Sequence, residues 1–235
     1  RGKYVEPSFS PDGKTVVYRK VSGGFITDPK WGLNSGIYAV SAKGGRAKLI
    51  TDSGVQPHFG ARNDHIYVTR GGEKPHIARV DIDGQHDTKL YQGKFSSEYR
   101  VSPNGKYLAF AERFKVFVTP FVERGDVIDI GPKAKNLPVE QLSVRAGEGV
   151  NWSSKSNELY WSLGADLYQA PVKGLFDIKT SSSDITPGDK ADKKIIEPKV
   201  IDLSYEQKVD IPSGRVAFVG GKVITMEGEQ VIENG

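Results

Sequence analysis

The sequence predicts an all-β protein built from four-stranded repeats, the blades of a β-propeller. A short passage recurs four times, as PSFSPDG from position 7, PHFGARN from position 57, YRVSPNG from position 99 and VNWSSKS from position 150. With Phe9, Phe59, Val101 and Trp152 taken as equivalent, successive copies lie 50, 42 and 51 residues apart. Each copy leads into an alternating apolar strand, so chance repetition is a poor explanation.

The first two repeats each contain four strand signals separated by turn residues. In the first repeat the predicted strands are 7–10, 15–21, 36–42 and 47–51. In the second they are 56–60, 65–69, 76–81 and 88–91. Asp83-Gly84 suits a tight hairpin between the last two of these strands.

The other two repeats are less regular. The third has predicted strands at 99–102, 107–113, 116–122 and 127–130. The fourth has strands at 150–153, 158–163 and 166–172, then a polar stretch at 180–194, after which 199–205 supplies the missing strand. We expect blades at about 4–54, 55–97, 98–147 and 148–211, followed by a separate segment at 212–235.

Proline and the turn residues of the recurring passage suit the start of a blade. Proline cannot donate to a sheet ladder, so Pro7 and Pro57 fit the first position of a strand, and Pro-Asp-Gly or Pro-Asn-Gly supplies the next turn. The apolar residues that we took as equivalent are expected to be buried between neighbouring blades. About four blades are present, and we expect them to be part of a larger six- or seven-bladed ring and of a longer polypeptide.

Composition narrows the function. The net charge is only +4 and the basic residues are scattered, so a nucleic-acid partner is not expected. The chain has no cysteine, which excludes disulfides and cysteine-type metal sites. No run approaches the roughly 18 apolar residues of a membrane span.

Four polar residues share one repeated position on the first strands of the blades: Ser8, His58, Arg100 and Asn151. If these strands are innermost, the four side chains line the central channel and suit a polar ligand or a water-filled pore. Simple solvation of an inner strand is the alternative. Trp31 lies in the long connection at 23–35 and is a candidate contact for a partner domain. We predict no catalytic residue and no metal ligand in this chain.

The passage PSFSPDGK from position 7 resembles the TolB-type propeller repeat, which also occurs in Tricorn and in prolyl-oligopeptidase-like peptidases. The resemblance covers residues 1 to about 205. Because binding proteins, peptidases and hydrolases all use this repeat, it implies an architecture and no single function.

The segment GRVAFVGGKVITMEGEQVIENG at 214–235 is similar to the opening of amidohydrolase-superfamily proteins, a subgroup of which carries a TolB-like propeller ahead of a metal-binding barrel. The resemblance implies a non-catalytic propeller portion of an exported metal-dependent hydrolase. It would be a docking or access-controlling module, located in the periplasm or outside the cell.

On this resemblance, zinc or another divalent metal would be bound by a catalytic domain beyond Gly235. The His-x-His ligand pair of that family is not present among His58, His65, His76 and His86. The alternatives are a stand-alone periplasmic protein-binding propeller and the gating propeller of a serine peptidase. We also expect the chain to associate, either with other chains that complete the ring or as an oligomer.

Overall fold

The computed structural model describes residues 3–21, 34–176, 196–211, 213–215, 217 and 219–235. The chain divides into one unit at Arg1–Leu203 and another at Ser204–Gly235. All regular elements of the described residues are strands, so the prediction of an all-β fold is confirmed. Among these residues, no helix is long and apolar enough to cross a bilayer.

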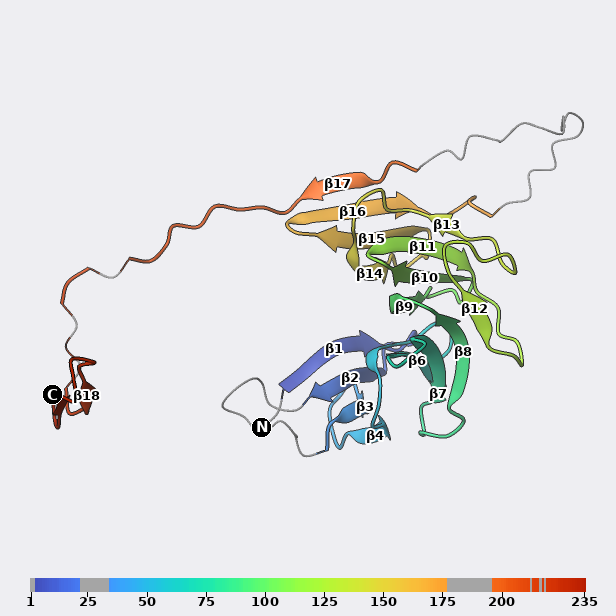
Figure 1. The fold of residues 1–235 in the computed structure, drawn as a ribbon. Coiled ribbons are helices and arrows are strands. Elements are labelled where there is room, and N and C mark those ends of the chain that lie inside the picture. Colours follow the sequence, from blue (N-terminus) through green and yellow to red (C-terminus); the bar gives the residue numbers. More distant parts are fainter. Residues whose placement is uncertain (1–2, 22–33, 177–195, 212, 216, 218) are drawn as a thin grey trace, which may run out of the picture. The chain divides into compact units, whose positions relative to one another are not determined.

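The first unit contains four sheets, each with four antiparallel strands, which are the four propeller blades (Figure 1). Blade 1 is β1 (Lys3–Phe9), β2 (Thr15–Val21), β3 (Gly36–Ser41) and β4 (Lys48–Thr51). Blade 2 is β5 (Val55–His58), β6 (His65–Arg70), β7 (His76–Asp81) and β8 (Thr88–Gly93). Blade 3 is β9 (Ser96–Val101), β10 (Tyr107–Glu112), β11 (Lys115–Pro120) and β13 (Glu140–Gln141). Blade 4 is β14 (Glu148–Trp152), β15 (Glu158–Leu163), β16 (Asp166–Pro171) and β17 (Lys199–Asp202).

The predicted last strand of the third repeat, 127–130, does not belong to blade 3, and that prediction is wrong. This segment forms β12 (Ile128–Ile130), which pairs in parallel with β8 at the outer edge of blade 2. The Tyr91 hydroxyl donates to the carbonyl of Val122 (2.7 Å) and accepts from its N–H (2.8 Å), which holds the chain leaving β11 beside blade 2. The strand signal was read correctly, but periodicity does not identify the strand's partner.

The serine of the recurring passage organises the turn between the first two strands of a blade. In blade 1 the Ser10 hydroxyl donates to Asp12 Oδ1 (2.6 Å) and accepts the N–H of Thr15 (2.9 Å). Ser102 makes the same pair of contacts in blade 3, with Asn104 Oδ1 (2.7 Å) and the N–H of Tyr107 (3.0 Å). Both serines are buried. The Ser-Pro-Asp/Asn-Gly sequence is therefore a turn held by its own side chains.

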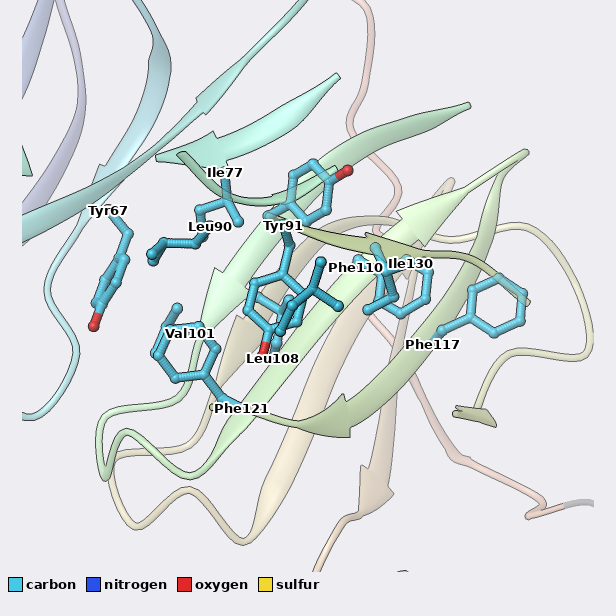
Figure 2. Packing of buried hydrophobic residues seen from close by; sticks show 12 residues of the cluster. Tyr67, Ile77, Leu90, Tyr91, Val101, Leu108, Phe110, Phe117, Phe121 and Ile130 are labelled. Carbon is cyan, nitrogen blue, oxygen red and sulfur yellow. The ribbon is translucent and has the colours of Figure 1, made fainter. Parts of the chain in front are cut away.

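Each pair of successive blades packs face to face over its own apolar cluster. Figure 2 shows the cluster between blades 2 and 3, where Tyr67, Leu90 and Tyr91 lie against side chains of blade 3. Sheet-on-sheet packing of this kind buries the alternate residues of each strand. The core is thus divided into three parts, one for each interface between blades.

The repeated apolar residue of the inner strand follows this rule in three blades. Phe59 is 6% exposed and Val101 2% exposed, each in the cluster shared with the preceding blade, and Trp152 is half-buried against blade 3. Phe9 is 64% exposed, so the prediction that it is buried is wrong. The physical reason is that in blades 2, 3 and 4 the equivalent residue packs against the preceding blade, whereas blade 1 is the first of the four described.

The second unit contains one antiparallel pair, β18 (Val223–Ile224) and β19 (Val231–Ile232), as two short strands were predicted here. The turn between them includes Gly228, whose φ of 60° lies in the left-handed region that glycine tolerates. All four strand residues are exposed, Ile224 to 64%. A two-stranded sheet of this size is marginally stable by itself.

The blade interfaces predict a large difference between two phenylalanines of blade 3. Phe110 is fully buried and stacks on Phe117 with 5.2 Å between ring centroids, whereas Phe114 is 78% exposed. We expect Phe110→Ala to lower the free energy of unfolding by about 3 to 5 kcal/mol. Phe114→Ala, the matched control, should change it by about 0.5 kcal/mol or less. Urea unfolding measures both, and equal midpoints would contradict the assignment of the core.

Candidate functional site

The first strands of all four blades, with the turns that follow them, line a half-open cavity of about 620 Å³, which we call the inner cavity. β1, β5, β9 and β14 each contribute to its wall. The four polar residues predicted to line a channel are all in this wall: Ser8, His58, Arg100 and Asn151. That they bind a ligand stays a prediction, and the contacts of each side chain decide which of them are available.

Three of the inner strands contain a β-bulge at the same repeat position. The register shifts after Val5 in β1, after Val55 in β5 and after Glu148 in β14. At each shift one residue has a left-handed backbone, namely Glu6 (φ 56°), Gln56 (φ 56°) and Gly149 (φ 65°). Bulges bend a strand and redirect the side chains that follow, here Ser8, His58 and Asn151. Only Gly149 gives a sequence signal for this conformation.

Glu6 connects blade 1 with blade 2 from the bulge of β1. Its carboxylate accepts two hydrogen bonds from Arg19, at 2.8 Å from Nε and 2.7 Å from Nη2. It also accepts the backbone N–H of Gln56 at 2.6 Å. Because a non-glycine residue with positive φ is strained, these charge-assisted bonds offset the cost of the bulge. The carboxylate at the cavity is therefore already neutralised by Arg19.

His58 connects blade 2 with blade 3 and is itself buried, with 6% of its surface exposed. Its Nε2 accepts the N–H of Val101 at 2.9 Å, so the proton is on Nδ1, which donates to the carbonyl of Gln56 at 3.0 Å. Burial, together with the smaller effect of the nearby Arg100 guanidinium, lowers the pKa of His58 to about 3. His58 is thus a neutral link between blades, and both of its nitrogens are occupied.

Arg100, a residue of β9, makes contacts across the same interface between blades 2 and 3. Its Nη1 donates to the carbonyl of Gln56 (3.3 Å), and its Nε contacts Oε1 of the buried Glu98 (3.4 Å). The backbone carbonyl of Arg100 accepts the indole N–H of Trp152 at 2.9 Å, which connects blade 3 with blade 4. The guanidinium side chain is 17% exposed, and Nη2 adds further N–H donors to those at Nε and Nη1.

The turns next to the inner cavity also bond from blade to blade. The N–H of Asp12 donates to Asn63 Oδ1 (3.2 Å), and the N–H of Asn104 donates to Ser156 Oγ (3.0 Å). Asn63 and Ser156 occupy the same repeat position, and Gly105 occupies it in blade 3. A side chain there would press on Ala61, with Cβ atoms 3.3 Å apart. Gly105 has no side chain that could accept a hydrogen bond from the turn of blade 2. Blades 2 and 3 are linked instead by the hydrogen bond between His58 and Val101.

The side chains best placed to meet a ligand are those that these links do not use. Asn151 is exposed and Ser8 is half-buried, and the rings of Phe9 and Trp152 flank them in the same wall. Pro7 and Pro57 lie on edge strands and lack an N–H, so they hinder addition of another strand at the cavity. Recognition at this wall therefore depends on side chains, with apolar rings beside a few polar groups.

The other predictions about sites concern Trp31 and metals. Trp31 lies outside the described residues. Within the described ranges, no group of three or more histidine, aspartate and glutamate side chains is arranged to hold a metal ion. Sequence reasoning missed the bulges at Glu6 and Gln56 and the blade-linking role of His58. Neither bulge has a sequence signal, because glutamate and glutamine do not favour a left-handed backbone as glycine does at Gly149.

No protein-family model matches the chain, and no curated protein matches it significantly. Among solved structures, it is similar to the β-propeller domain of Cps50 (Swd1) from Myceliophteria thermophila, with 11% identity, a TM-score of 0.49, and coverage of 86% of this chain and 60% of that one. A protein of unknown function from Desulfotomaculum acetoxidans matches with 13% identity and a TM-score of 0.46, over 74% of this chain and 53% of that one. A protein assigned as TolB from Agrobacterium tumefaciens matches with 15% identity and a TM-score of 0.44, over 73% of this chain and 78% of that one.

These similarities are distant, and none of them carries a functional argument. The chain spans 60% and 53% of the first two structures. The assignment of the fold depends on the blade topology described above, which is that of a β-propeller.

The environment of His58 predicts a specific dependence of stability on pH. Its pKa falls from 6.5 to about 3 on folding, so between these values the unfolded chain takes up a proton that the folded chain does not. The stabilising contribution of His58 to the free energy of unfolding is complete above pH 6.5. It decreases by up to about 1.4 kcal/mol per pH unit as the pH falls toward about 3.

The variant His58→Gln, which does not titrate, isolates this effect. Between about pH 7 and about pH 4, the wild type should lose more unfolding free energy than the variant, because the titrations of the carboxylates are common to both proteins. Urea unfolding at each pH measures the difference. Parallel curves for the two proteins would refute the buried, neutral state of His58.

Proposed function

We propose that this chain is a non-catalytic docking module whose inner cavity receives a short acidic segment of a partner protein. The observation that carries the proposal is that a single repeat position from four blades converges on one cavity of about 620 Å³. A volume of this order accommodates a small ligand or a few residues of a peptide. Because the four blades all contribute, a ligand bound there would contact the whole blade series.

The hydrogen-bond donors of the wall favour an acidic group. Arg19 neutralises the Glu6 carboxylate, so that carboxylate does not oppose an anion in the cavity. Arg100 is paired with Glu98 through Nε (3.4 Å) but keeps N–H donors at Nη2, and Asn151 provides an exposed amide. The rings of Phe9 and Trp152 supply apolar surface for the methylene groups or side chains beside such an acid.

The proposal predicts saturable binding of a blocked tripeptide of glutamate, which serves as the probe. Trp152 lies in the wall, so the change in tryptophan fluorescence measures binding. Asn151→Ala should weaken binding about 10-fold, because one good polar contact is worth roughly 1.4 kcal/mol. The same tripeptide with glutamine in place of glutamate should bind more weakly to the wild type.

Asn136→Ala is the matched control, because Asn136 donates to the carbonyl of Asp129 and is not in the wall of the inner cavity. It should bind the acidic tripeptide as the wild type does. Two results would contradict the docking proposal: no saturable binding, or equal weakening by the two asparagine substitutions.

At a finer level, we propose that the module is the propeller portion of an exported amidohydrolase-like, metal-dependent hydrolase in the periplasm or outside the cell. The similarity of residues 214–235 to the opening of amidohydrolases supports this. So does the exposure of all four residues of β18 and β19, since so small a sheet needs further structure to pack against. A stand-alone protein-binding propeller and the gating propeller of a serine peptidase are the competing functions.

The coding sequence after Gly235 distinguishes these three functions. An amidohydrolase parent predicts a His-x-His pair at the end of a barrel strand, followed by further histidine and aspartate ligands. A serine nucleophile elbow would favour the peptidase, and a stop codon would favour the stand-alone module. Each of the last two results would overturn the amidohydrolase assignment and leave the docking proposal to its own binding test.

A further inference from the structure

We propose that a second pocket, at the other end of β9 from the inner cavity, binds a free α-amino acid with an apolar side chain. We call it the rim pocket. It has a volume of about 500 Å³ and shares no wall residue with the inner cavity. Its wall includes Phe95, Glu112, Arg113, Ile130, Gly131 and Lys133. The proposal is therefore independent of the docking function of the inner cavity.

The rim pocket lies where the chain crosses from blade 3 to the edge of blade 2. One part of its wall is the segment 131–134, which follows β12. The other parts are the connection between β8 and β9, with Lys94 and Phe95, and the end of β10, with Glu112 and Arg113. Blade 1 covers the far face of blade 2 and blade 4 covers that of blade 3, so both blades that build the site have neighbours on each face.

The carboxylate of Glu112 is the buried polar group of this wall, and the residue is only 7% exposed. Its Oε2 accepts a hydrogen bond from the hydroxyl of the buried Ser96 at 3.1 Å. Within the described part of the chain, no donor is bonded to Oε1 and no basic side chain forms an ion pair with Glu112. A buried charge without a partner is costly, so a ligand that brings a positively charged N–H donor to Oε1 removes this cost.

Gly131 leaves the space beside this carboxylate open. A Cβ atom at position 131 would lie 3.6 Å from Glu112 Oε2 and 3.7 Å from Oε1. These are ordinary van der Waals distances, so a methyl group would fit, but it would take the space next to both oxygens. With glycine at this position, the ammonium group of a ligand can occupy that space.

Three exposed basic side chains line the same pocket, namely Lys94, Arg113 and Lys133. Cζ of Arg113 lies 4.1 Å and Nζ of Lys94 5.3 Å from the centroid of the Phe95 ring. Phe95 thus holds two positive charges beside the pocket by cation–π contact. Among the residues that the structure describes, no carboxylate forms an ion pair with any of the three, so they can bind a carboxylate of a ligand.

A ligand that carries both charges matches this wall best. A simple cation would be attracted by Glu112 but opposed by the three basic side chains. A simple anion would be opposed by Glu112 and by Asp129, whose Oδ1 accepts a hydrogen bond from Gln92 Nε2 at 2.8 Å. An α-amino acid brings its ammonium group to Glu112 Oε1 and its carboxylate to the basic side chains. Its apolar side chain then contacts Phe95 and Pro132 of the wall.

An NMR titration of the isotope-labelled protein with L-leucine tests the rim pocket. The wild type should bind leucine with a Kd of about 1 mM or below, as expected for so small a ligand. The amide signals of Phe95, Glu112 and Gly131 should shift. Two analogues are matched probes, because isoamylamine lacks the carboxylate of leucine and isocaproate lacks its ammonium group. Each should bind at least about 10-fold more weakly than leucine.

Substitutions separate the two halves of the site. Glu112→Gln removes the charge with little change of shape, and Gly131→Ala fills the space beside it, so each should raise the Kd for leucine at least about 10-fold. Glu148→Gln, at an exposed glutamate of β14 outside the rim pocket, is the matched control and should leave that Kd unchanged. Replacing Lys94 and Lys133 together by glutamine should weaken the binding of leucine and not that of isoamylamine, which has no carboxylate.

Three results would overturn the proposal. They are no saturable shifts with leucine up to about 10 mM, an analogue that binds as tightly as leucine, and folded Glu112→Gln and Gly131→Ala variants that bind leucine as the wild type does. Urea unfolding checks that both variants are folded. Asn151→Ala, which tests the inner cavity, should leave the binding of leucine unchanged, so failure of the docking proposal and failure of this one are distinguishable.

Discussion

Packing of each blade against its neighbours is the constraint on which the rest of this structure depends. A four-stranded sheet has two faces, and blades 2 and 3 bury both of them in apolar clusters shared with adjacent blades. The repeated residue of the inner strand marks this rule, because Phe59 and Val101 are covered by the preceding blade while Phe9 is not. The distribution of buried and exposed aromatic residues therefore follows from the position of each blade in the series.

The same constraint determines what the inner cavity offers for binding. Several polar groups around it are occupied in holding blades together, through Glu6 with Gln56, His58 with Val101, and Trp152 with Arg100. A polar residue at a repeated inner position is thus used in one blade as a structural link and in another as an exposed group. Asn151 is exposed, whereas His58, its equivalent, is buried. This division explains why binding should respond to Asn151 and stability to His58.

Sequence reasoning located the blades because proline, turn residues and strand alternation are local signals. It placed Ser8, His58, Arg100 and Asn151 in one wall because equivalent positions in a repeat have equivalent locations. It did not anticipate the bulges at Glu6 and Gln56, whose left-handed backbones are held by long-range hydrogen bonds. The pairing of β12 with blade 2 was missed for a similar reason, since the choice of partner depends on Tyr91 and a neighbouring sheet edge.

Native-state hydrogen exchange tests most directly the claim that each blade is stabilised by its neighbours. The account predicts the largest opening free energies for amides of β6, β7, β10 and β11, in the blades covered on both faces, and smaller ones for β2 and β3 of blade 1. Amides of blade 1 that exchange as slowly as those of blades 2 and 3 would contradict it.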